Sequence, residues 1–396
     1  MTTPARFLRI PEEAQFTSRV RDPRLTSRVG VLLGLSLGTC FVTGLISHWA
    51  QLPLPKVPFP TSPSWGYRVS QGVHVASGTA AVPLLLVKLW SVYPRLFRRP
   101  ARGLSGAAVT VAERLSVALL VSAAIFELAT GLANVAHWYP WPFSFRRTHY
   151  AVAWLLIGAL LIHVAIHLPV IRSSLAKGIA EPEGSDGQDL VEPGAAEAGV
   201  SRRSLLRATQ TAAAVAVVAT VGQTVPQLRE LSVLAPRSGR GPGGVPINKT
   251  AVAAGVIGLA DAPDYRLEVS VDGRVESFSL ADLRAMKQRS DSLPIACVEG
   301  WSAVGRWGGV PLATLLASVG ATREDHVTVH SLQPRGPFRT TTLPANFAWD
   351  PRTLLALDLA GAPLSLDHGY PCRLVAPNRP GVLQTKWVAR LEVSPP

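Results

Sequence analysis

Cysteine is scarce in this chain of 396 residues, which contains only Cys40, Cys297 and Cys372. Three isolated cysteines exclude a scaffold held together by disulfides, and none of them stands in a Cys-x-x-Cys metal-binding motif. Charged residues are also scarce, since Asp, Glu, Lys and Arg make up 16% of the chain while hydrophobic residues make up 47%. A soluble domain carries about 25% charged residues, so part of this chain is expected to lie in a membrane.

Acidic residues are outnumbered by basic ones, 26 against 39, and the formal net charge is +13. A strongly basic chain can bind nucleic acid, but this sequence has no basic stripe with interleaved aromatic residues. The arginines instead flank long apolar runs, which is typical of the cytoplasmic loops of membrane proteins. We therefore expect the lipid bilayer as a partner and expect no nucleic acid.

Five apolar segments are each long enough to cross a bilayer, which takes about 20 residues. They lie at residues 28–48, 67–90, 113–137, 150–171 and 207–225. Basic residues gather before the first segment, between the second and third, and between the fourth and fifth. The positive-inside rule therefore predicts a multi-pass cell-membrane protein with a cytoplasmic N-terminus and an extracytoplasmic C-terminal part.

The stretches between the apolar segments complete the predicted division of the chain. Residues 181–200 are acidic and rich in Gly, Pro and Ala, which predicts a flexible linker. The expected divisions are a cytoplasmic N-terminal segment (1–27), a four-helix transmembrane bundle (28–175), a cytoplasmic linker (176–204), a fifth transmembrane helix (205–226), a tether (227–245) and an extracytoplasmic domain (246–396).

The start of the fifth apolar segment resembles an export signal. Residues 201–222 read SRRSLLRATQTAAAVAVVATVG, a paired arginine before a mildly apolar, Ala-rich run. This pattern is similar to a twin-arginine signal placed inside the chain. The alternative is two positive-inside arginines before a weak span. We favour export, because that route carries folded proteins and suits a domain that receives a cofactor in the cytoplasm.

The C-terminal part, 246–396, has the pattern of a β-rich α+β domain. Residues 264–283 alternate apolar and polar residues around Asp272-Gly273, which predicts a β-hairpin. The runs HVTVHSL, YPCRLVA and WVARLEV predict further strands, and PLATLLASVG predicts a short helix that ends at Gly320. A domain of about 150 residues is large enough to bury a core of its own.

Cys297 lies between a strand-like run and a turn rich in Trp and Gly, in LPIACVEGWSAVGRWGG. Its thiol could be a nucleophile, a soft metal ligand, a buried inert group or half of a disulfide with Cys372. No cysteine-hydrolase signature surrounds it. The residue types alone leave the remaining alternatives open.

Three blocks in this domain resemble the molybdopterin-binding domain of the sulfite oxidase superfamily. They are CVEGWS (297–302), RWGGVPLATLL (306–316) and DHGYPCRLVAPNRPGVLQTKW (367–387). Over about residues 250–395 the chain is most similar to the periplasmic methionine-sulfoxide reductase catalytic subunits. The resemblance implies a molybdopterin cofactor and makes Cys297 the catalytic residue, with its thiolate on molybdenum. It also implies cofactor contacts from these residues: Ser331, His368, Arg373, Lys386 and Asn248.

One departure from the family bears on the substrate. Eukaryotic sulfite oxidases carry Asn-Arg-Arg after the cysteine, where this chain has Val298-Glu299-Gly300. The change weakens the prospect of sulfite as substrate and favours a sulfoxide-like one. Two alternatives stay open: a sulfite dehydrogenase that passes electrons to quinone, and a membrane-anchored module without metal that binds another protein.

Histidines in the apolar segments are candidate haem ligands, because ionisable residues inside spans are costly and usually functional. His149 and His163 lie fourteen residues apart on the fourth span, which places both on one face about 21 Å apart. The helix count and this spacing are similar to those of the b-type cytochrome subunits of membrane-bound hydrogenases. We expect one or two haem b groups, with His74 and His149 on an outer iron and His48 as a further candidate. For each histidine, hydrogen-bonded packing is the alternative.

These expectations combine into one predicted function. The chain is expected to be a membrane-bound, molybdopterin-dependent oxidoreductase that exchanges electrons between a quinone pool, haem b and an extracytoplasmic molybdenum centre. That centre would transfer an oxo group to or from a small substrate. A redox partner protein is a further expected partner of the chain. Glu127, deep in the third span, is expected to be either a proton carrier near a quinone or a neutral, hydrogen-bonded group.

Overall fold

The structure, a computed structural model, describes residues 16, 18, 20–97, 104–179, 200–222, 224–235 and 241–395. Most of the predicted linker at 176–204 and of the N-terminal segment therefore lies outside the described residues. By contacts between residues the chain forms two compact units. The first combines the chain up to Phe41 with Ala76–Val218, and the second combines Val42–Val75 with Ala219–Pro396.

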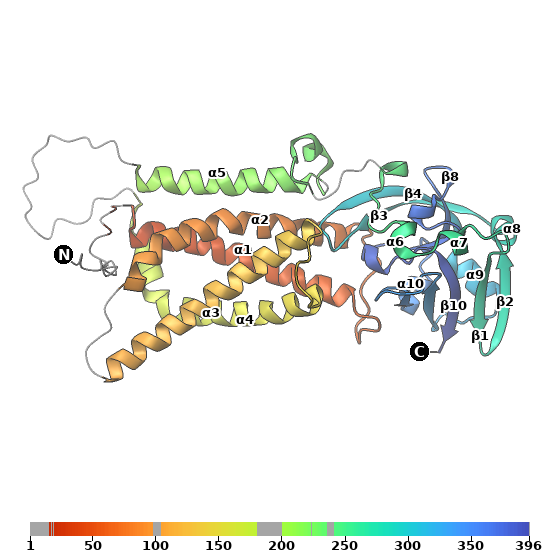
Figure 1. Ribbon diagram of the computed structural model, residues 1–396, viewed down its shortest axis with the longest axis horizontal. Helices are drawn as coiled ribbons and strands as arrows, with labels where there is room; N and C mark the ends of the chain where they lie inside the picture. Colours follow the sequence, from red (N-terminus) through yellow and green to blue (C-terminus); the bar gives the residue numbers. More distant parts are fainter. Residues whose placement is uncertain are drawn as a thin grey trace, which may run out of the picture. The chain divides into compact units, whose positions relative to one another are not determined.

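Long helices dominate the first 221 residues (Figure 1). They are α1 (Pro23–Ala50), α2 (Gly66–Val92), α3 (Leu104–Val135), α4 (Phe145–Ala176) and α5 (Arg202–Val221). Each predicted apolar segment overlaps one of them. All five are long and apolar enough to cross a membrane, judged by length and composition. The chain therefore has five candidate membrane-spanning helices among its described residues.

The first unit shows the packing that a lipid environment requires. Its core is built from side chains such as Leu25, Val29, Leu84 and Ala124. Large apolar residues also point outward from the same helices, where a soluble helix would carry polar ones. The helices thus pack through one face and leave an apolar face for lipid.

Two β-sheets make up most of the second unit. The strands are β1 (Arg266–Val271), β2 (Arg274–Ser279), β3 (Arg289–Ala296), β4 (Ser302–Pro311), β5 (His326–Ser331), β6 (Thr340–Leu343), β7 (Leu354–Leu359), β8 (Ala362–Pro363), β9 (Arg373–Val375) and β10 (Val388–Ser394). One sheet has the order β2-β1-β10-β5-β6 and the other β3-β4-β7-β8, with β9 paired to β7. Every pairing is antiparallel except that of β1 with β10.

Short helices precede these strands or lie between them, and one 3₁₀ turn follows α2. The α-helical ones are α6 (Ala251–Ala254), α7 (Ile257–Ala260), α8 (Leu280–Ala285), α9 (Leu312–Ser318) and α10 (Ala345–Ala348). The 3₁₀ turns are η2 (Tyr93–Phe97), η3 (Pro226–Leu231), η4 (Pro242–Gly244), η5 (Leu366–His368) and η6 (Gly381–Leu383). The described part of the predicted tether, 227–235 and 241–245, contains most of η3 and all of η4.

The local predictions for this domain are confirmed. Asp272 and Gly273 have φ values of 47° and 78°, the left-handed pair that a tight hairpin between β1 and β2 requires. The helix α9 is followed by Gly320 at φ 82°. The three predicted strand runs become β5, β9 and β10. The parallel pairing of β1 with β10 joins segments more than 100 residues apart and has no local signal.

Candidate functional site

Cys297 follows the last residue of β3 and starts a tight turn. Its amide donates to the carbonyl of Trp301 at 2.8 Å, and Gly300, at φ 90°, donates back to the Cys297 carbonyl at 3.0 Å. The residue before it, Ala296, pairs with Ser302 on β4 and forms a parallel bridge with Pro380. The strand end that carries the thiol is thus held from both sides.

No disulfide joins the cysteines, which removes the pairing of Cys297 with Cys372. Cys297 is 1% exposed and packs in the apolar cluster with Trp301 and Trp307. The Cys372 thiol lies 3.1 Å from the hydroxyl of Tyr265, and burial raises its pKa to about 12. Cys372 is therefore a protonated core residue, and of the two cysteines in this domain Cys297 is the one that remains for chemistry.

Three basic side chains that the sequence singled out are buried in the same domain: His368, Arg373 and Lys386. Arg373, on β9, donates from Nη1 to the carbonyl of His368 at 3.3 Å and lies over the ring of Trp307, 5.3 Å from its centre. The Lys386 ammonium donates to the carbonyls of Lys249 and Asp367 at 2.7 and 2.8 Å. All three predicted residues are thus brought together.

His368, in η5, is held in one tautomer. Its Nε2 lies 3.0 Å from the carbonyl of Val245, which can only accept, so Nε2 carries the proton. Its Nδ1 then accepts from the Ser365 hydroxyl at 3.0 Å. Burial lowers the pKa of His368 to about 4. The imidazole is therefore neutral at physiological pH and fixed in orientation.

Gly369 explains how these residues approach so closely. It has φ 110°, in the region that favours glycine. A Cβ at this position would lie 3.1 Å from the Cβ of Lys386 and 3.2 Å from the Cβ of Arg373. A glycine between η5 and β9 therefore lets the backbones that carry the two cations pack together.

Neither buried cation forms an ion pair among the described residues, although Asp367 lies within electrostatic range of Lys386. Burial lowers the pKa of Arg373 to about 10, and a thiolate at the nearby Cys297 opposes this shift. Burial, and then Arg373, lower the pKa of Lys386, while Asp367 and Cys297 oppose that shift. The Nε of Arg373 is buried without a hydrogen-bond partner. An unpaired buried charge is costly, so this site is built for an anion.

The remaining predicted cofactor contacts have supporting positions. The Ser331 hydroxyl, at the end of β5, donates to the carbonyl of Lys386 at 2.8 Å and so holds that residue's backbone. Asn248 is half-buried beside Lys249, whose ammonium donates to the Gln333 side chain at 2.6 Å. Sequence reasoning missed Lys249 and Gln333, although each lies within two residues of a predicted contact.

The site fits a molybdopterin. Such a cofactor brings an anionic phosphate and a soft metal held by a dithiolene, and the metal prefers thiolate ligands. The described part of this domain offers the Cys297 thiol and, within electrostatic reach of it, two cations that form no ion pair there. The thiol therefore matches the metal of the cofactor, and the two cations match its phosphate.

In the helices, two of the predicted histidines have closely similar surroundings. Within the second unit, Nδ1 of His74 lies 3.0 Å from the Thr43 hydroxyl, and a Cβ on Gly44 would lie 3.5 Å from its ring. Within the first unit the same arrangement recurs. There Nδ1 of His149 lies 3.1 Å from the Thr130 hydroxyl, and a Cβ on Gly131 would lie 3.7 Å from its ring.

The sequence carries a signal for this repeat that was not recognised, the Thr-Gly-Leu triplet at 43–45 and again at 130–132. Nε2 of His149 also lies 3.1 Å from the Glu127 carboxylate, so this acid is hydrogen-bonded. His163 lies on α4 with its ring 4.6 Å from that of His167, and His48 lies in the last turn of α1.

Comparison with known proteins agrees with this site. Residues 254–395 match the family model of the oxidoreductase molybdopterin binding domain. YedZ1 of Azospira oryzae, named as a subunit of a protein-methionine-sulfoxide reductase, is 33% identical over 135 residues, which cover 34% of this chain and 50% of that protein. The catalytic subunit MsrP of Xanthomonas campestris is 33% identical over 139 residues, 31% of this chain and 43% of that protein.

Human mitochondrial sulfite oxidase is 32% identical over 163 residues, which cover 34% of this chain and 30% of that protein. The chain thus spans half of the first of these relatives and less than half of the other two. The family match and the site coincide, since Cys297, His368, Arg373 and Lys386 all lie within 254–395. The C-terminal part of this chain is therefore an oxidoreductase molybdopterin-binding domain, homologous to the sulfite oxidases and the methionine-sulfoxide reductases.

Proposed function

We propose that this protein reduces a small sulfoxide-like substrate at an extracytoplasmic molybdenum centre, with electrons taken from quinol through haem b in its helices. The observation that carries the proposal is the buried thiol of Cys297 near two buried cations, Arg373 and Lys386, that form no ion pair with any described residue. The balanced reaction is quinol plus sulfoxide giving quinone, sulfide and water, with two electrons and two protons transferred.

Each residue of the site has a role in this reaction. When bound, the cofactor supplies a metal that accepts and releases an oxo group. Cys297 would hold the metal as a thiolate, and Arg373 and Lys386 would hold the phosphate, by planar bidentate contacts and by a compact charge respectively. The neutral His368, whose ring is fixed by the Val245 carbonyl and the Ser365 hydroxyl, would position the pterin through ring contact. Ser331 keeps the backbone of Lys386 in place.

The turn after the cysteine supports a neutral substrate. Glu299 accepts a hydrogen bond from the Trp301 indole at 3.0 Å, so a carboxylate is held two residues from Cys297. A negative charge there repels sulfite and leaves a neutral sulfoxide unaffected. This favours sulfoxide reduction over the alternative, sulfite dehydrogenation with electrons passed to quinone.

The repeated Thr-Gly and His arrangement supports His74 and His149 as ligands of haem b. The Thr130 hydroxyl donates to the Phe126 carbonyl at 2.7 Å, so it accepts from Nδ1–H of His149. In the neutral imidazole Nε2 then carries no proton, as a metal-ligating histidine requires. Glu127 now faces Nε2 and would have to withdraw from it.

We further propose that His48 and His163 are the remaining candidates for haem ligation. The glycines beside His74 and His149 provide space next to each ring, which a larger side chain would fill. A second haem would need ligands of its own, and these two histidines are the other predicted residues in the helices.

The predicted orientation has support within the first unit. Arg28 donates to the carbonyls of Ser174 and Lys177 at the end of α4, and Arg202 at the start of α5 pairs with Asp22 before α1. The basic ends of α1, α4 and α5 thus meet, as they would on a cytoplasmic face. Arg202 belongs to the paired arginine for which we propose twin-arginine export of the folded domain.

A spectroscopic and metal survey of the detergent-solubilised protein tests the proposal. We expect molybdenum, a b-type haem spectrum that quinol reduces, and reoxidation of the haem by a sulfoxide. Cys297→Ser should abolish sulfoxide reduction and leave haem absorbance unchanged. Reduction of the haem by sulfite would support the sulfite dehydrogenase, and a folded protein without molybdenum would support the binding module.

A further inference from the structure

The loop between α1 and α2 forms part of the core of the molybdopterin domain. Phe59 is 6% exposed and belongs to the same buried cluster as Leu267, Val310 and Leu355 of the sheets. Its ring packs edge-on against Trp49, with ring centres 4.9 Å apart. An aromatic anchor of this loop is therefore buried among the side chains of the C-terminal domain.

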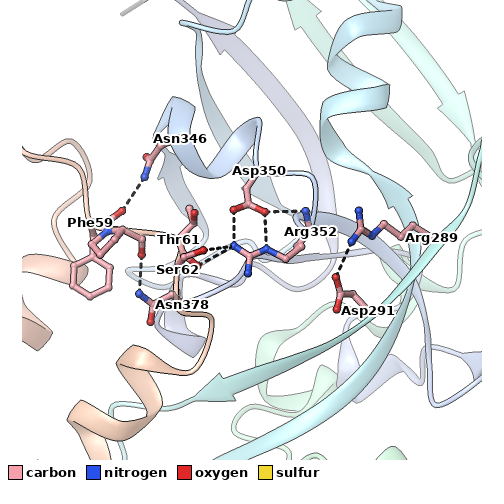
Figure 2. Close-up of polar contacts among 10 residues, drawn as sticks. Phe59, Thr61, Ser62, Arg289, Asp291, Asn346, Asp350, Arg352 and Asn378 are labelled. Carbon is pink, nitrogen blue, oxygen red and sulfur yellow. Dashed lines mark hydrogen bonds and ion pairs between the residues drawn. The ribbon is translucent and has the colours of Figure 1, made fainter.

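Asn378 holds this loop through both ends of its side-chain amide and through its backbone amide; Figure 2 shows Asn378 beside the loop. Its side-chain nitrogen donates to the carbonyl of Pro60 at 2.7 Å, and its side-chain oxygen accepts from the amide of Tyr67 at 2.5 Å. Its own amide donates to the carbonyl of Ser64 at 3.2 Å. One buried residue at φ 56° thus fixes both ends of the turn that leads into α2.

A second group of contacts lies beside the first in Figure 2. Asn346 donates to the carbonyl of Phe59 at 2.8 Å. Arg352 donates to the carbonyl of Thr61 at 3.2 Å and to the hydroxyl of Ser62 at 2.9 Å, while the Asp350 carboxylate holds its guanidinium at 2.9 and 3.1 Å. The domain therefore recognises the loop mainly through main-chain carbonyls.

The contacts at the start of α2 converge on the strand end that carries the catalytic cysteine. Arg68 donates from Nε to the Ser302 hydroxyl at 3.1 Å, and Ser302 pairs with Ala296. Asn378 lies two residues before Pro380, which bridges to the same Ala296. Ala296 directly precedes Cys297, so both contacts reach the backbone next to the thiol.

The same helix carries a candidate haem ligand. His74 lies seven residues after Tyr67 on α2, a rise of about 10 Å along the helix axis. The helix is continuous between them. A rigid element thus runs from the histidine to the contacts that meet the cysteine-bearing strand end.

We propose that residues 57–68 are a docking segment for the molybdopterin domain. By binding this segment, the domain holds the start of α2, and with it His74, in a fixed position relative to the Cys297 turn. Asn378, Arg352 and Arg68 are the positioning residues. This inference rests on the proposed function, in which electrons pass from the helices to molybdenum. The docking segment makes that transfer possible within a single chain.

Asn378→Gly tests the proposal, because glycine keeps the left-handed backbone and removes both side-chain hydrogen bonds. Asp272→Gly is the matched control, since Asp272 has φ 47° in the exposed β1–β2 turn. In the full-length protein in detergent, the Tyr67 amide of Asn378→Gly should exchange with deuterium at least tenfold faster than in the control. Quinol-driven sulfoxide reduction should fall at least tenfold, while reduction driven by a viologen dye and molybdenum content stay at the control level.

Three results would overturn the docking proposal: unchanged Tyr67 exchange, quinol-driven turnover equal to that of Asp272→Gly, or an equal loss of dye-driven turnover. If the unaltered protein is active with dye but not with quinol, the quinone link of the proposed function fails instead. Exchange of the amides at 297–302 then decides the docking proposal. Faster exchange in Asn378→Gly than in Asp272→Gly supports it, and equal rates contradict it.

A substitution on the loop side provides an independent check. A Cβ on Gly66 would lie 3.1 Å from the Asn378 side-chain oxygen, so Gly66→Val should push the docking segment away. Gly258→Val is the control, because no atom lies within 4 Å of a Cβ there. Quinol-driven turnover should fall at least tenfold only in Gly66→Val, and equal turnover in both would contradict the proposal.

Discussion

At the scale of single residues, the site depends on cations that are buried at a cost. Arg373 is 4% exposed, and its Nε lacks a hydrogen-bond partner. Lys386 is buried as well, and its ammonium donates to two main-chain carbonyls. Such groups destabilise the protein that lacks cofactor and favour the anion that neutralises them. The same residues therefore oppose folding and promote binding.

This opposition predicts an unusual result for Arg373→Met. An apolar side chain of similar length removes the unpaired buried charge, and such replacements are often neutral or stabilising by about 1–4 kcal/mol. We expect the melting temperature of cofactor-free protein, from cells grown without molybdate, to stay level or rise. Molybdenum content after growth with molybdate should fall at least tenfold. A lower melting temperature together with full molybdenum content would contradict the assigned role of Arg373.

His368 predicts a pH dependence of stability in the cofactor-free protein. Burial first, and then Arg373 and Lys386, lower its pKa to about 4, against the hydrogen bond to Val245 and the charge of Asp367. An unfolded histidine has a pKa of about 6.5. Between about pH 6.5 and pH 4, His368 is therefore protonated in the unfolded chain and neutral in the folded protein. The contribution of His368 to the free energy of unfolding should therefore be fully retained above about pH 6.5. It should be lost as the pH falls below that value, by at most about 1.4 kcal/mol per pH unit.

Thermal unfolding in detergent between pH 7 and pH 4.5 measures this effect. His368→Gln keeps a hydrogen-bonding side chain without a titrating group, so its melting temperature should fall less over the same range. Parallel curves for the two proteins would show that His368 does not titrate between its folded and unfolded states.

At the scale of elements, the link between η5 and β9 decides whether the two cations meet. Gly369 combines φ 110° with close contact to the backbones that carry Arg373 and Lys386. Gly361 has φ 85° but no atom within 4 Å of a Cβ position, so it isolates the effect of backbone strain. Comparing alanine at each position separates strain from crowding.

Gly369→Ala should destabilise the protein by more than Gly361→Ala, which is expected to cost about 1 kcal/mol from backbone strain alone. It should also lower molybdenum content several-fold, since crowding moves Arg373 and Lys386 apart. Melting temperature and metal analysis of the two variants provide the comparison. Equal losses in both would mean that the close approach at Gly369 is unimportant for the site.

The two Thr-Gly and His arrangements allow an element-scale test of the haem proposal. A hydrogen bond from the ligand's Nδ1–H to a hydroxyl makes the imidazole a stronger donor to iron. Thr43→Val and Thr130→Val remove the hydroxyl and keep the shape. Each should raise the midpoint potential of a haem while the haem remains bound, measured by redox titration of its absorbance. Unchanged potentials in both variants would remove these histidines from the iron.

At the scale of the whole molecule, the features that the sequence predicts are those set by residues close together in the chain. The helices, the Asp272-Gly273 hairpin and α9 were predicted because periodicity and turn residues are local signals. Cys297, Arg373 and Lys386 were singled out because their sequence blocks are distinctive. The parallel β1–β10 pair and the burial of Phe59 among the sheets could not be predicted, because each joins distant segments without a local pattern.

The central claim is that the Cys297 thiolate binds molybdenum. X-ray absorption at the molybdenum edge tests it most directly, on the purified full-length protein and on Cys297→Ser. The site described here predicts that the serine variant retains molybdenum, because Arg373 and Lys386 still hold the phosphate, but loses one sulfur neighbour of the metal. The same number of sulfur neighbours in both proteins would contradict the claim.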